Sequence, residues 1–311
     1  MLVLGKNLKL KTTFKGLIYG LSGAGKTTLA LSCPKPLLID CDDGAERVES
    51  RFLRDVPVLK PQNYNEIIDI VLNKSQDYET IVIDTIGALV DYMLEQVMTD
   101  DPKLRQRDGS PTIKAYGAIK APFKALLQAI KTQGKSVLFV GHAEEKDTGS
   151  GLVYRIQCAG STANLLVGML DFVGFMDLNG DQRMITFAPS ERATAKNALG
   201  LEPNIKVPDT SVAGNTFMQK IVLNAIQKRA EEANSETQKE FDALIETMKE
   251  KVNAADSCAK LNEVLEWGGK VQHIWESKVK LWELVQAKGK ELTCEFDKAT
   301  KTFLEKKQEE K

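Results

Sequence analysis

Short apolar, β-branched runs alternate with helix-like patterns up to about residue 200. The runs predict strands at residues 16–19, 36–40, 80–84 and 136–140. The periodicity between them predicts helices at residues 27–32, 64–73, 86–97 and 113–132. This alternation is typical of a parallel sheet with crossover helices, in which the ligand crevice lies at the carboxyl ends of the strands. We therefore expect an α/β fold for this part of the chain.

The pattern changes after about Pro208. Before that point, residues 172–176 and 183–188 flank a Leu-Asn-Gly-Asp turn and predict a hairpin. Beyond it, turn signals are sparse, Lys, Glu, Ala and Leu recur with helical spacing, and Gly268 with Gly269 indicates a break between two helices. The predicted domains are residues 1–208 and a helical region, residues 209–311.

Composition limits the classes of protein that remain. A chain of 311 residues is long enough for two cores, and 42% hydrophobic with 27% charged residues excludes a collagen-like or disordered chain. The net charge of −1 gives no overall basic field, although it hides local patches. The longest apolar stretch, 163–176, contains Asp171 and is shorter than the roughly 18 to 20 residues that span a bilayer. We expect no membrane partner.

The cysteine pattern bears on the cellular setting. Five cysteines are widely spaced, form no Cys-x-x-Cys pair and accompany only two histidines, which favours neither a disulfide framework nor a zinc site. The first residues lack the apolar block and small-residue cleavage site of a secretory signal. We therefore expect a reducing, cytoplasmic setting.

The strongest motif is GLSGAGKT at residues 20–27, a full Walker A pattern between a predicted strand and a predicted helix. Glycines in such a loop let backbone N–H groups point at phosphate oxygens. Lys26 adds a point charge, and the Thr27 hydroxyl is a ligand for Mg²⁺. We expect ATP and Mg²⁺ as cofactors. The expected nucleotide contacts are Gly20, Ser22, Gly23, Ala24, Gly25, Lys26, Thr27 and Thr28.

A nucleoside triphosphatase also needs a carboxylate on a neighbouring strand to hold the metal. Asp84 ends a run of four β-forming residues and is the Walker B candidate, so Thr27 and Asp84 are the expected metal-binding pair. The alternative is that Asp84 is an ordinary strand-end aspartate that caps the following helix.

Two more polar groups follow strands at the same edge. Asp42 lies just after strand 36–40, where its carboxylate is expected to orient an attacking water; alternatively, Asp42 and Asp43 cap a helix that opens at Gly44. His142 lies just after strand 136–140, where a neutral imidazole can hydrogen-bond the γ-phosphate or its water. The alternative is an exposed histidine without a role. The expected catalytic residues are Lys26, Asp42, Asp84 and His142.

The order of these motifs resembles the RecA-like core of recombinases and replicative helicases. The segments that carry the closer resemblance are YGLSGAGKTT, LLIDCDDG, IVIDT, AYGAIKAPFKALLQAIKTQGK and GHAEEKD. Together they look like the phage-encoded P-loop nucleotide-binding proteins that include the RecA-core single-strand annealing proteins. The resemblance covers about residues 10–208 and implies a RecA-like P-loop ATPase domain. The helical C-terminal region resembles no family that we can name.

The resemblance also implies roles by position. Asp42 falls where RecA-like enzymes carry the catalytic glutamate, although its side chain is one methylene shorter, and His142 falls where they carry a polar sensor. The loops after Val97 and after His142 correspond to loops that line single-stranded DNA in that family. Lys196 resembles a cation that acts on a nucleotide site in cis or in trans. The expected DNA contacts are Lys103, Arg105, Arg107, Lys146 and Arg155, with solvated loop charge as the alternative.

The leading interpretation is an Mg²⁺-dependent ATPase of phage DNA recombination or replication that binds single-stranded DNA and promotes annealing. The alternative is a nucleotide-sensing scaffold or loader with little turnover, whose helical region docks a phage or host replication or recombination protein. A small-molecule kinase is a third, weaker interpretation because no arginine-rich lid follows Asp84. RecA-like sites usually complete themselves across a subunit interface, so a homo-oligomer is one option and the assembly stays open.

Overall fold

The chain forms two compact units, a core unit, Leu10–Gln227, and a C-terminal unit, Lys228–Lys311. The structure is a computed structural model. It describes residues 13–149, 151–158, 162–180, 182–208, 216–274 and 276–305. Within those ranges, no helix has both the length and the apolar character needed to cross a membrane.

A mixed, mostly parallel sheet forms the centre of the core unit. The strands are β1 Lys15–Gly20, β2 Pro36–Asp40, β3 Val58–Leu59, β4 Thr80–Asp84, β5 Ser136–Asp147, β6 Leu152–Ile156, β7 Phe172–Asn179, β8 Gln182–Thr186, β9 Lys196–Asn197 and β10 Asn204–Lys206. Their order is β10-β8-β7-β1-β5-β4-β2-β3, with β6 paired to β5 and β9 paired to β7. Strands β1, β2, β3, β4, β5 and β7 are mutually parallel, which confirms the predicted α/β fold.

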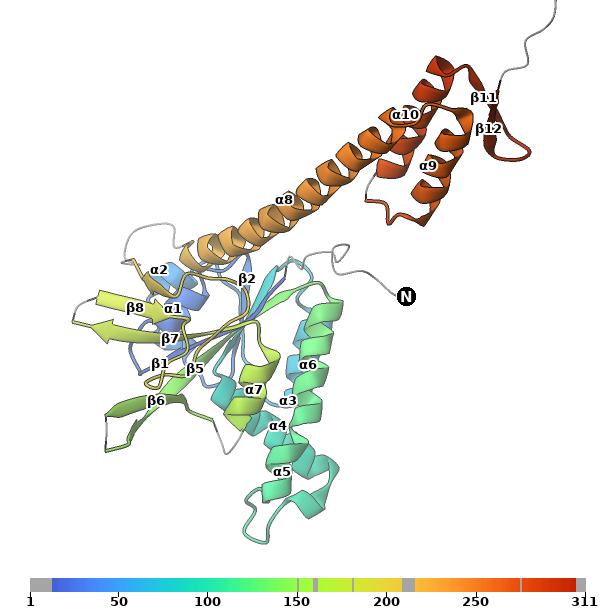
Figure 1. Cartoon of the computed structure of the whole chain (residues 1–311). Coiled ribbons are helices and arrows are strands. Elements are labelled where there is room, and N and C mark those ends of the chain that lie inside the picture. Colours follow the sequence, from blue (N-terminus) through green and yellow to red (C-terminus); the bar gives the residue numbers. More distant parts are fainter. Residues whose placement is uncertain are drawn as a thin grey trace, which may run out of the picture. The chain divides into compact units, whose positions relative to one another are not determined.

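Helices cover both faces of this sheet (Figure 1). The core-unit helices are α1 Lys26–Ala30, α2 Ser50–Leu53, α3 Tyr64–Asn73, α4 Ile86–Asp100, α5 Ile113–Ala118, α6 Lys120–Thr132 and α7 Thr162–Met169. Helices α3, α4, α6 and α7 pack on one face, whereas α1 packs on the other. Because successive strand residues point to opposite faces, Ile81 and Ile83 contact the first layer and Val82 contacts the second. Burial on both faces explains the continuous apolar runs of the sequence.

The segment after His142 is a β-hairpin and not the loop that the sequence predicts. Strand β5 continues past Val140 to Asp147, and its last part pairs with β6 in antiparallel register. Gly149 and Gly151 adopt positive φ angles of 77° and 146° in the connection, a conformation that favours glycine. The strand pattern beyond Val140 is hard to recognise because its side chains are exposed and charged on both faces.

Helix α8 (Phe217–Asn253) starts in the core unit and ends in the C-terminal unit. Its first turns bury Met218, Val222 and Ala225 in the same apolar cluster as α1. The hydroxyl of Ser32 accepts a hydrogen bond of 2.8 Å from the backbone N–H of Met218. The units therefore divide inside this helix, downstream of Pro208.

The C-terminal unit has its own small core, built by the end of α8 with α9 (Cys258–Lys270), α10 (Ser277–Glu291), β11 (Cys294–Asp297) and β12 (Thr302–Glu305). The predicted break between two helices is present but lies slightly later than Gly268 and Gly269, because α9 continues to Lys270 and α10 begins at Ser277. Gly268 instead permits close packing: a Cβ at this position would lie 2.2 Å from Cδ2 of Leu281 on α10.

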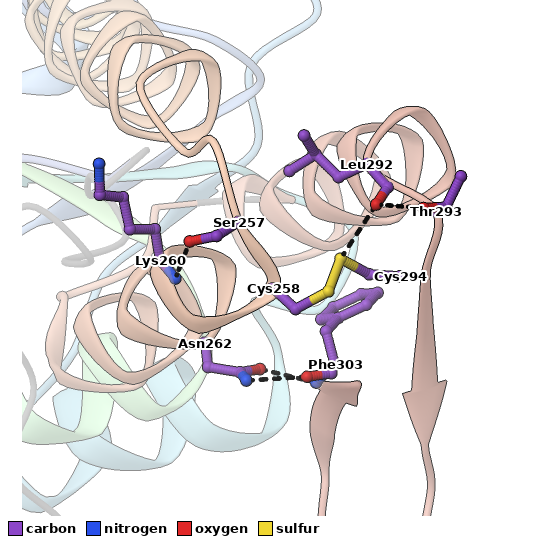
Figure 2. The surroundings of a disulfide bond; sticks show 8 residues. All are labelled: Ser257, Cys258, Lys260, Asn262, Leu292, Thr293, Cys294 and Phe303. Carbon is purple, nitrogen blue, oxygen red and sulfur yellow. Dashed lines mark hydrogen bonds between the residues drawn. A yellow bond between two sulfur atoms is a disulfide. The ribbon is translucent and has the colours of Figure 1, made fainter. Parts of the chain in front are cut away.

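A disulfide joins Cys258 to Cys294 in the C-terminal unit, contrary to the expectation from the cysteine pattern (Figure 2). The two residues are 36 positions apart in the sequence. They meet because each begins an element, α9 or β11, and the side chain of Asn262 pairs with the backbone of Phe303 on β12, through bonds of 3.0 and 2.7 Å. Spacing along the chain does not reveal such a contact. Cys33 and Cys41 are buried and form no disulfide.

Candidate functional site

The loop at residues 20–27 leaves the end of β1 and leads into α1. Gly23 and Gly25 have positive φ angles of 77° and 86°, and Gly25 caps the helix, so these two positions need glycine. Lys26 is only 6% exposed, and its Nζ donates a hydrogen bond of 2.8 Å to the carbonyl of Leu21. The loop thus wraps around the ammonium group of its own lysine.

The charge of Lys26 is held in a partly desolvated site. Burial lowers the pKa of Lys26, while the carboxylates of Asp84 and Asp42 act in the opposite direction. A bound anion would favour the charged ammonium form further, because an opposite charge close to a buried group stabilises its ionised state.

Thr27 and Asp84 meet at the centre of the site. The Thr27 hydroxyl donates a hydrogen bond of 2.5 Å to Oδ2 of Asp84, which ends β4 and is 4% exposed. Burial raises the pKa of Asp84 to about 6, against the opposing effect of the Thr27 hydrogen bond. A hydroxyl and a carboxylate are hard oxygen ligands of the kind that Mg²⁺ prefers. The predicted metal-binding pair is therefore brought together.

In the acidic turn after β2, Asp40 makes hydrogen bonds that the sequence analysis did not predict. Asp40, which is 2% exposed, accepts hydrogen bonds from the backbone N–H groups of Gly44 (2.9 Å) and Ala45 (3.1 Å). Oδ1 of Asp42 also accepts from the N–H of Gly44, at 3.0 Å, whereas Asp43 pairs with an exposed lysine. Asp40 therefore shapes the turn, with support from Asp42. Sequence reasoning missed Asp40, although its place at the end of a strand was a usable signal.

His142 faces Asp42 across the site. Its Nε2 lies 3.9 Å from Oδ2 of Asp42, and the register of β1 and β5 places His142 opposite Gly20. Burial and the nearby charge of Lys26 lower the pKa of His142, with Asp42 opposing them. This shift favours the neutral form of the imidazole.

These groups line one cavity of about 440 Å³. The lining includes nine residues expected from the sequence, namely Ser22, Gly23, Gly25, Lys26, Thr27, Thr28, Asp42, Asp84 and His142. Gly20 and Ala24 do not line it, and Ala24 packs in the apolar cluster under α1. Side chains that sequence reasoning missed also line the cavity, notably Arg47, Arg51, Phe52 and Arg183. No motif marks them, because they reach the cavity through tertiary packing.

Lys196 does not line the cavity of its own chain. Its Nζ donates hydrogen bonds to the carbonyls of Val167 (3.0 Å) and Gly168 (3.1 Å) at the end of α7. Lys196 pairs with Val173 near the start of β7, whereas Gly20 pairs with Met176 farther along that strand. A contact with the nucleotide site of another copy stays a prediction.

The cations expected to contact DNA lie in two segments outside the cavity. Lys103 and Arg107 are exposed between α4 and α5, and Arg105 there pairs with Glu95 at 2.5 Å. In the β5–β6 hairpin, Lys146 pairs with Glu144, and Arg155 donates to main-chain carbonyls, including that of Tyr154 at 3.0 Å. Figure 1 shows the two segments as separate projections from the core unit.

Comparison with known proteins supports a nucleotide-binding identity for the core unit. A family profile described as an AAA domain matches residues 12–199, which include the loop at 20–27 and residues Asp42, Asp84 and His142. No curated protein sequence matches the chain at a significant level.

Proposed function

Since the chain belongs to the AAA domain family, we propose that it is an Mg²⁺-dependent ATPase of phage DNA recombination or replication that binds single-stranded DNA and promotes annealing. The P-loop ATPase domain itself follows from the family. One observation carries the proposal for the site: Lys26, Thr27 and Asp84 converge in a single cavity, with Asp42 and His142 on its wall.

Catalysis of phosphoryl transfer consists largely of positioning and electrostatics. In this chain, different residues would bind the metal ion and the phosphates. Mg²⁺, when bound, neutralises phosphate charge. Thr27 and Asp84 are the residues that would hold it, since their oxygens are 2.5 Å apart. Lys26 would exchange its bond to the Leu21 carbonyl for phosphate oxygens, and the N–H groups of the loop would complete the cradle.

We assign to Asp42 and His142 the orientation of the attacking water. The N–H of Gly44 holds Oδ1 of Asp42, while Oδ2 lies toward Nε2 of His142. A water held between the carboxylate and the neutral imidazole would be oriented from two sides. His142 is also continuous with the β5–β6 hairpin, so its contacts can transmit the state of the nucleotide to that hairpin.

Single-stranded DNA is the proposed partner. Support comes from the resemblance of the motifs to phage annealing proteins and from the exposed cations Lys103 and Arg107. Arg155 uses its guanidinium to bind carbonyls, and Lys146 is shared with Glu144, so we assign the main phosphate contacts to the segment between α4 and α5. Such contacts release counterions and make binding sensitive to salt.

One observation favours the second candidate function, a nucleotide-sensing scaffold or loader. The C-terminal unit has its own apolar core and contributes no residue to the cavity, so among the described residues it is separate from the chemistry. In this alternative it docks a phage or host replication or recombination protein, and ATP turnover is low.

Binding of a fluorescent oligonucleotide to the full chain tests the proposal, with MgATP, with MgADP and without nucleotide, at two salt concentrations. We expect nucleotide-dependent binding that Lys26→Ala removes. Lys103→Glu with Arg107→Glu should weaken binding about 10-fold and reduce the salt slope by about 2. The matched control is Lys124→Glu with Lys131→Glu on exposed positions of α6, which should behave like the wild type.

ATP turnover in the same samples separates the two candidates. Stimulation by single-stranded DNA supports the ATPase, whereas nucleotide binding without turnover supports the scaffold or loader. Equal oligonucleotide affinity in the wild type and in the variant changed at Lys103 and Arg107 would refute the proposed DNA surface.

A further inference from the structure

Arg183 reaches the phosphate loop from β8, which lies two strands from β1 in the same sheet. It is the second residue of β8, which a hairpin joins to β7, the parallel neighbour of β1. Its Nε lies 3.4 Å from the position that a Cβ on Gly25 would occupy, and the side chain lines the cavity with Lys26. Arg183 thus enters from the β7 side of β1, whereas Asp84 enters from the β4 side.

The guanidinium of Arg183 lacks a partner among the described residues. Its Nε is buried and makes no hydrogen bond there, and no described carboxylate pairs with the side chain. Other arginines of the core unit differ: Arg105 pairs with Glu95, and Arg192 pairs with Asp177 at 3.0 Å. A buried N–H of a charged group without an acceptor is unfavourable. We therefore expect a ligand in the cavity to accept a hydrogen bond from the guanidinium of Arg183.

The charges around the cavity indicate that the acceptor is an anion. Four formal cations and three carboxylates line it. Arg51 is paired with Glu49 at 2.6 Å, which leaves Lys26, Arg47 and Arg183 facing Asp42 and Asp84. Arg183 lies against Gly25 in the loop that also carries Lys26, whereas Arg47 lies near Gly44. Two of the three cations are therefore at the glycine loop, where the phosphate chain would lie.

We propose that Arg183 binds the phosphate chain of the nucleotide in cis, beside Lys26, at phosphates that ATP and ADP share. This inference rests on the proposed function. A guanidinium can donate two parallel hydrogen bonds to phosphate oxygens, which a lysine cannot do with the same geometry. Its place against Gly25 puts it at the glycine loop. Nucleotide affinity would then need no cation from a second copy and would not depend on protein concentration.

Calorimetric titration of MgATP, MgADP and AMP into the full chain tests this role. We expect Arg183→Ala to weaken MgATP and MgADP about 10- to 100-fold, the effect of losing charge-assisted hydrogen bonds, and to leave AMP unchanged. Arg183→Lys should recover part of the affinity. The matched control is Arg54→Ala, which removes an exposed arginine that does not line the cavity and should bind as the wild type does.

The outcomes separate this inference from the proposed function. A wild type that does not bind ATP, or a Lys26→Ala variant that binds it normally, overturns both. Binding that Lys26→Ala removes but Arg183→Ala leaves intact overturns the role of Arg183 alone, and so does a loss confined to MgATP.

Thermal melts without nucleotide distinguish binding from a structural role. Arg183→Ala should not lower the melting temperature below that of the wild type, because it removes a buried N–H that makes no hydrogen bond to the described protein. If Arg183→Ala does not fold, Arg183→Gln keeps most of the stem without the charge and takes its place in the titration. Wild-type affinity in Arg183→Gln would then overturn the inference.

Discussion

The two units of the chain differ in what they bury. In the core unit, the buried charged residues include Asp40 and Asp84, which end β2 and β4, and Lys26, which begins α1 after the loop that follows β1. In the C-terminal unit, the only buried polar residue among those described is Ser277, and a disulfide lies beside an apolar cluster. The core unit therefore contains a group of desolvated charged residues, whereas the described part of the C-terminal unit contains none.

This difference indicates that the core unit binds a ligand, whereas the disulfide of the C-terminal unit contributes to stability. Charges buried near one another cost free energy unless hydrogen bonds or a ligand satisfy them, so their presence marks the core unit as the one built to bind something. The C-terminal unit is small and buries limited apolar area, which makes a covalent cross-link valuable. Changes in the two units should therefore affect different properties.

The largest expected effect is removal of the disulfide. Cys258→Ser with Cys294→Ser opens a loop of 36 residues and should lower the free energy of unfolding of the C-terminal unit by about 3–4 kcal/mol. All three tryptophans of the chain follow residue 228, so their fluorescence in urea reports this unit. The affinity of the core unit for MgATP should not change.

The control for the disulfide is a reductant, which should destabilise the wild type but not the double variant. Identical urea midpoints for the oxidised wild type and the variant would show that the cross-link does not stabilise the C-terminal unit. A coupled loss of nucleotide affinity would break the proposed separation of the units.

The next largest effect is an increase in the free energy of unfolding when the charge of Asp84 in the core unit is removed. Burial raises the pKa of Asp84 to about 6 from 3.8, so the folded state holds a proton that the unfolded state releases between these values. Stability should fall as the pH rises through that window. Asp84→Asn has no such proton and should be more stable than the wild type by about 2–3 kcal/mol above pH 6, with no difference below pH 4.

Urea unfolding at several pH values without nucleotide measures this difference. The same variant should lose Mg²⁺-dependent nucleotide binding, so that stability is gained as function is lost. Asp256→Asn is the control from the C-terminal unit, because Asp256 is exposed and pairs with Lys260 at 2.8 Å; removing its charge should not stabilise the chain. A variant at Asp84 that is less stable than the wild type at pH 7.5 would contradict the account.

Local signals predicted the part of the fold and site that local sequence specifies. Strands β2 and β4 match their predicted ranges because both faces are buried, and α3 matches because Asn63 accepts the N–H of Glu66 at its start. The sequence identifies Lys26 and Thr27 as candidates because they belong to one contiguous motif, and Asp84 because it ends a strand; all three line the cavity.

Contacts set by tertiary pairing could not be predicted in this way. The β5–β6 hairpin depends on pairing of strands whose exposed side chains carry little pattern. Arg183 reaches the cavity only through the register of β7 with β1 and β8. Cys258 and Cys294 meet only after α9 packs against the terminal hairpin. In each case, the contact forms between residues that are distant in the sequence, or the position of a side chain depends on how a neighbouring strand or helix packs.

The smallest expected effect compares two adjacent glycines of α9. A Cβ on Gly268 would meet Leu281 at 2.2 Å, so Gly268→Ala should destabilise the C-terminal unit by about 1–2 kcal/mol through overpacking. A Cβ on Gly269 has nothing within 4 Å, so Gly269→Ala should stabilise the same unit by about 0.5 kcal/mol through helix propensity. Urea unfolding followed by tryptophan fluorescence measures both. Equal effects of the two variants would contradict the packing of α9 on α10.

Hydrogen exchange on the full chain, with and without MgATP, tests most directly the claim that the core unit alone holds the nucleotide. Binding stabilises whatever it contacts, and exchange slows accordingly. We predict slower exchange at residues 21–28, 42–45 and 183, and no change at residues 257–274 and 276–305. Unchanged exchange at residues 21–28, or protection confined to the C-terminal unit, would contradict the account.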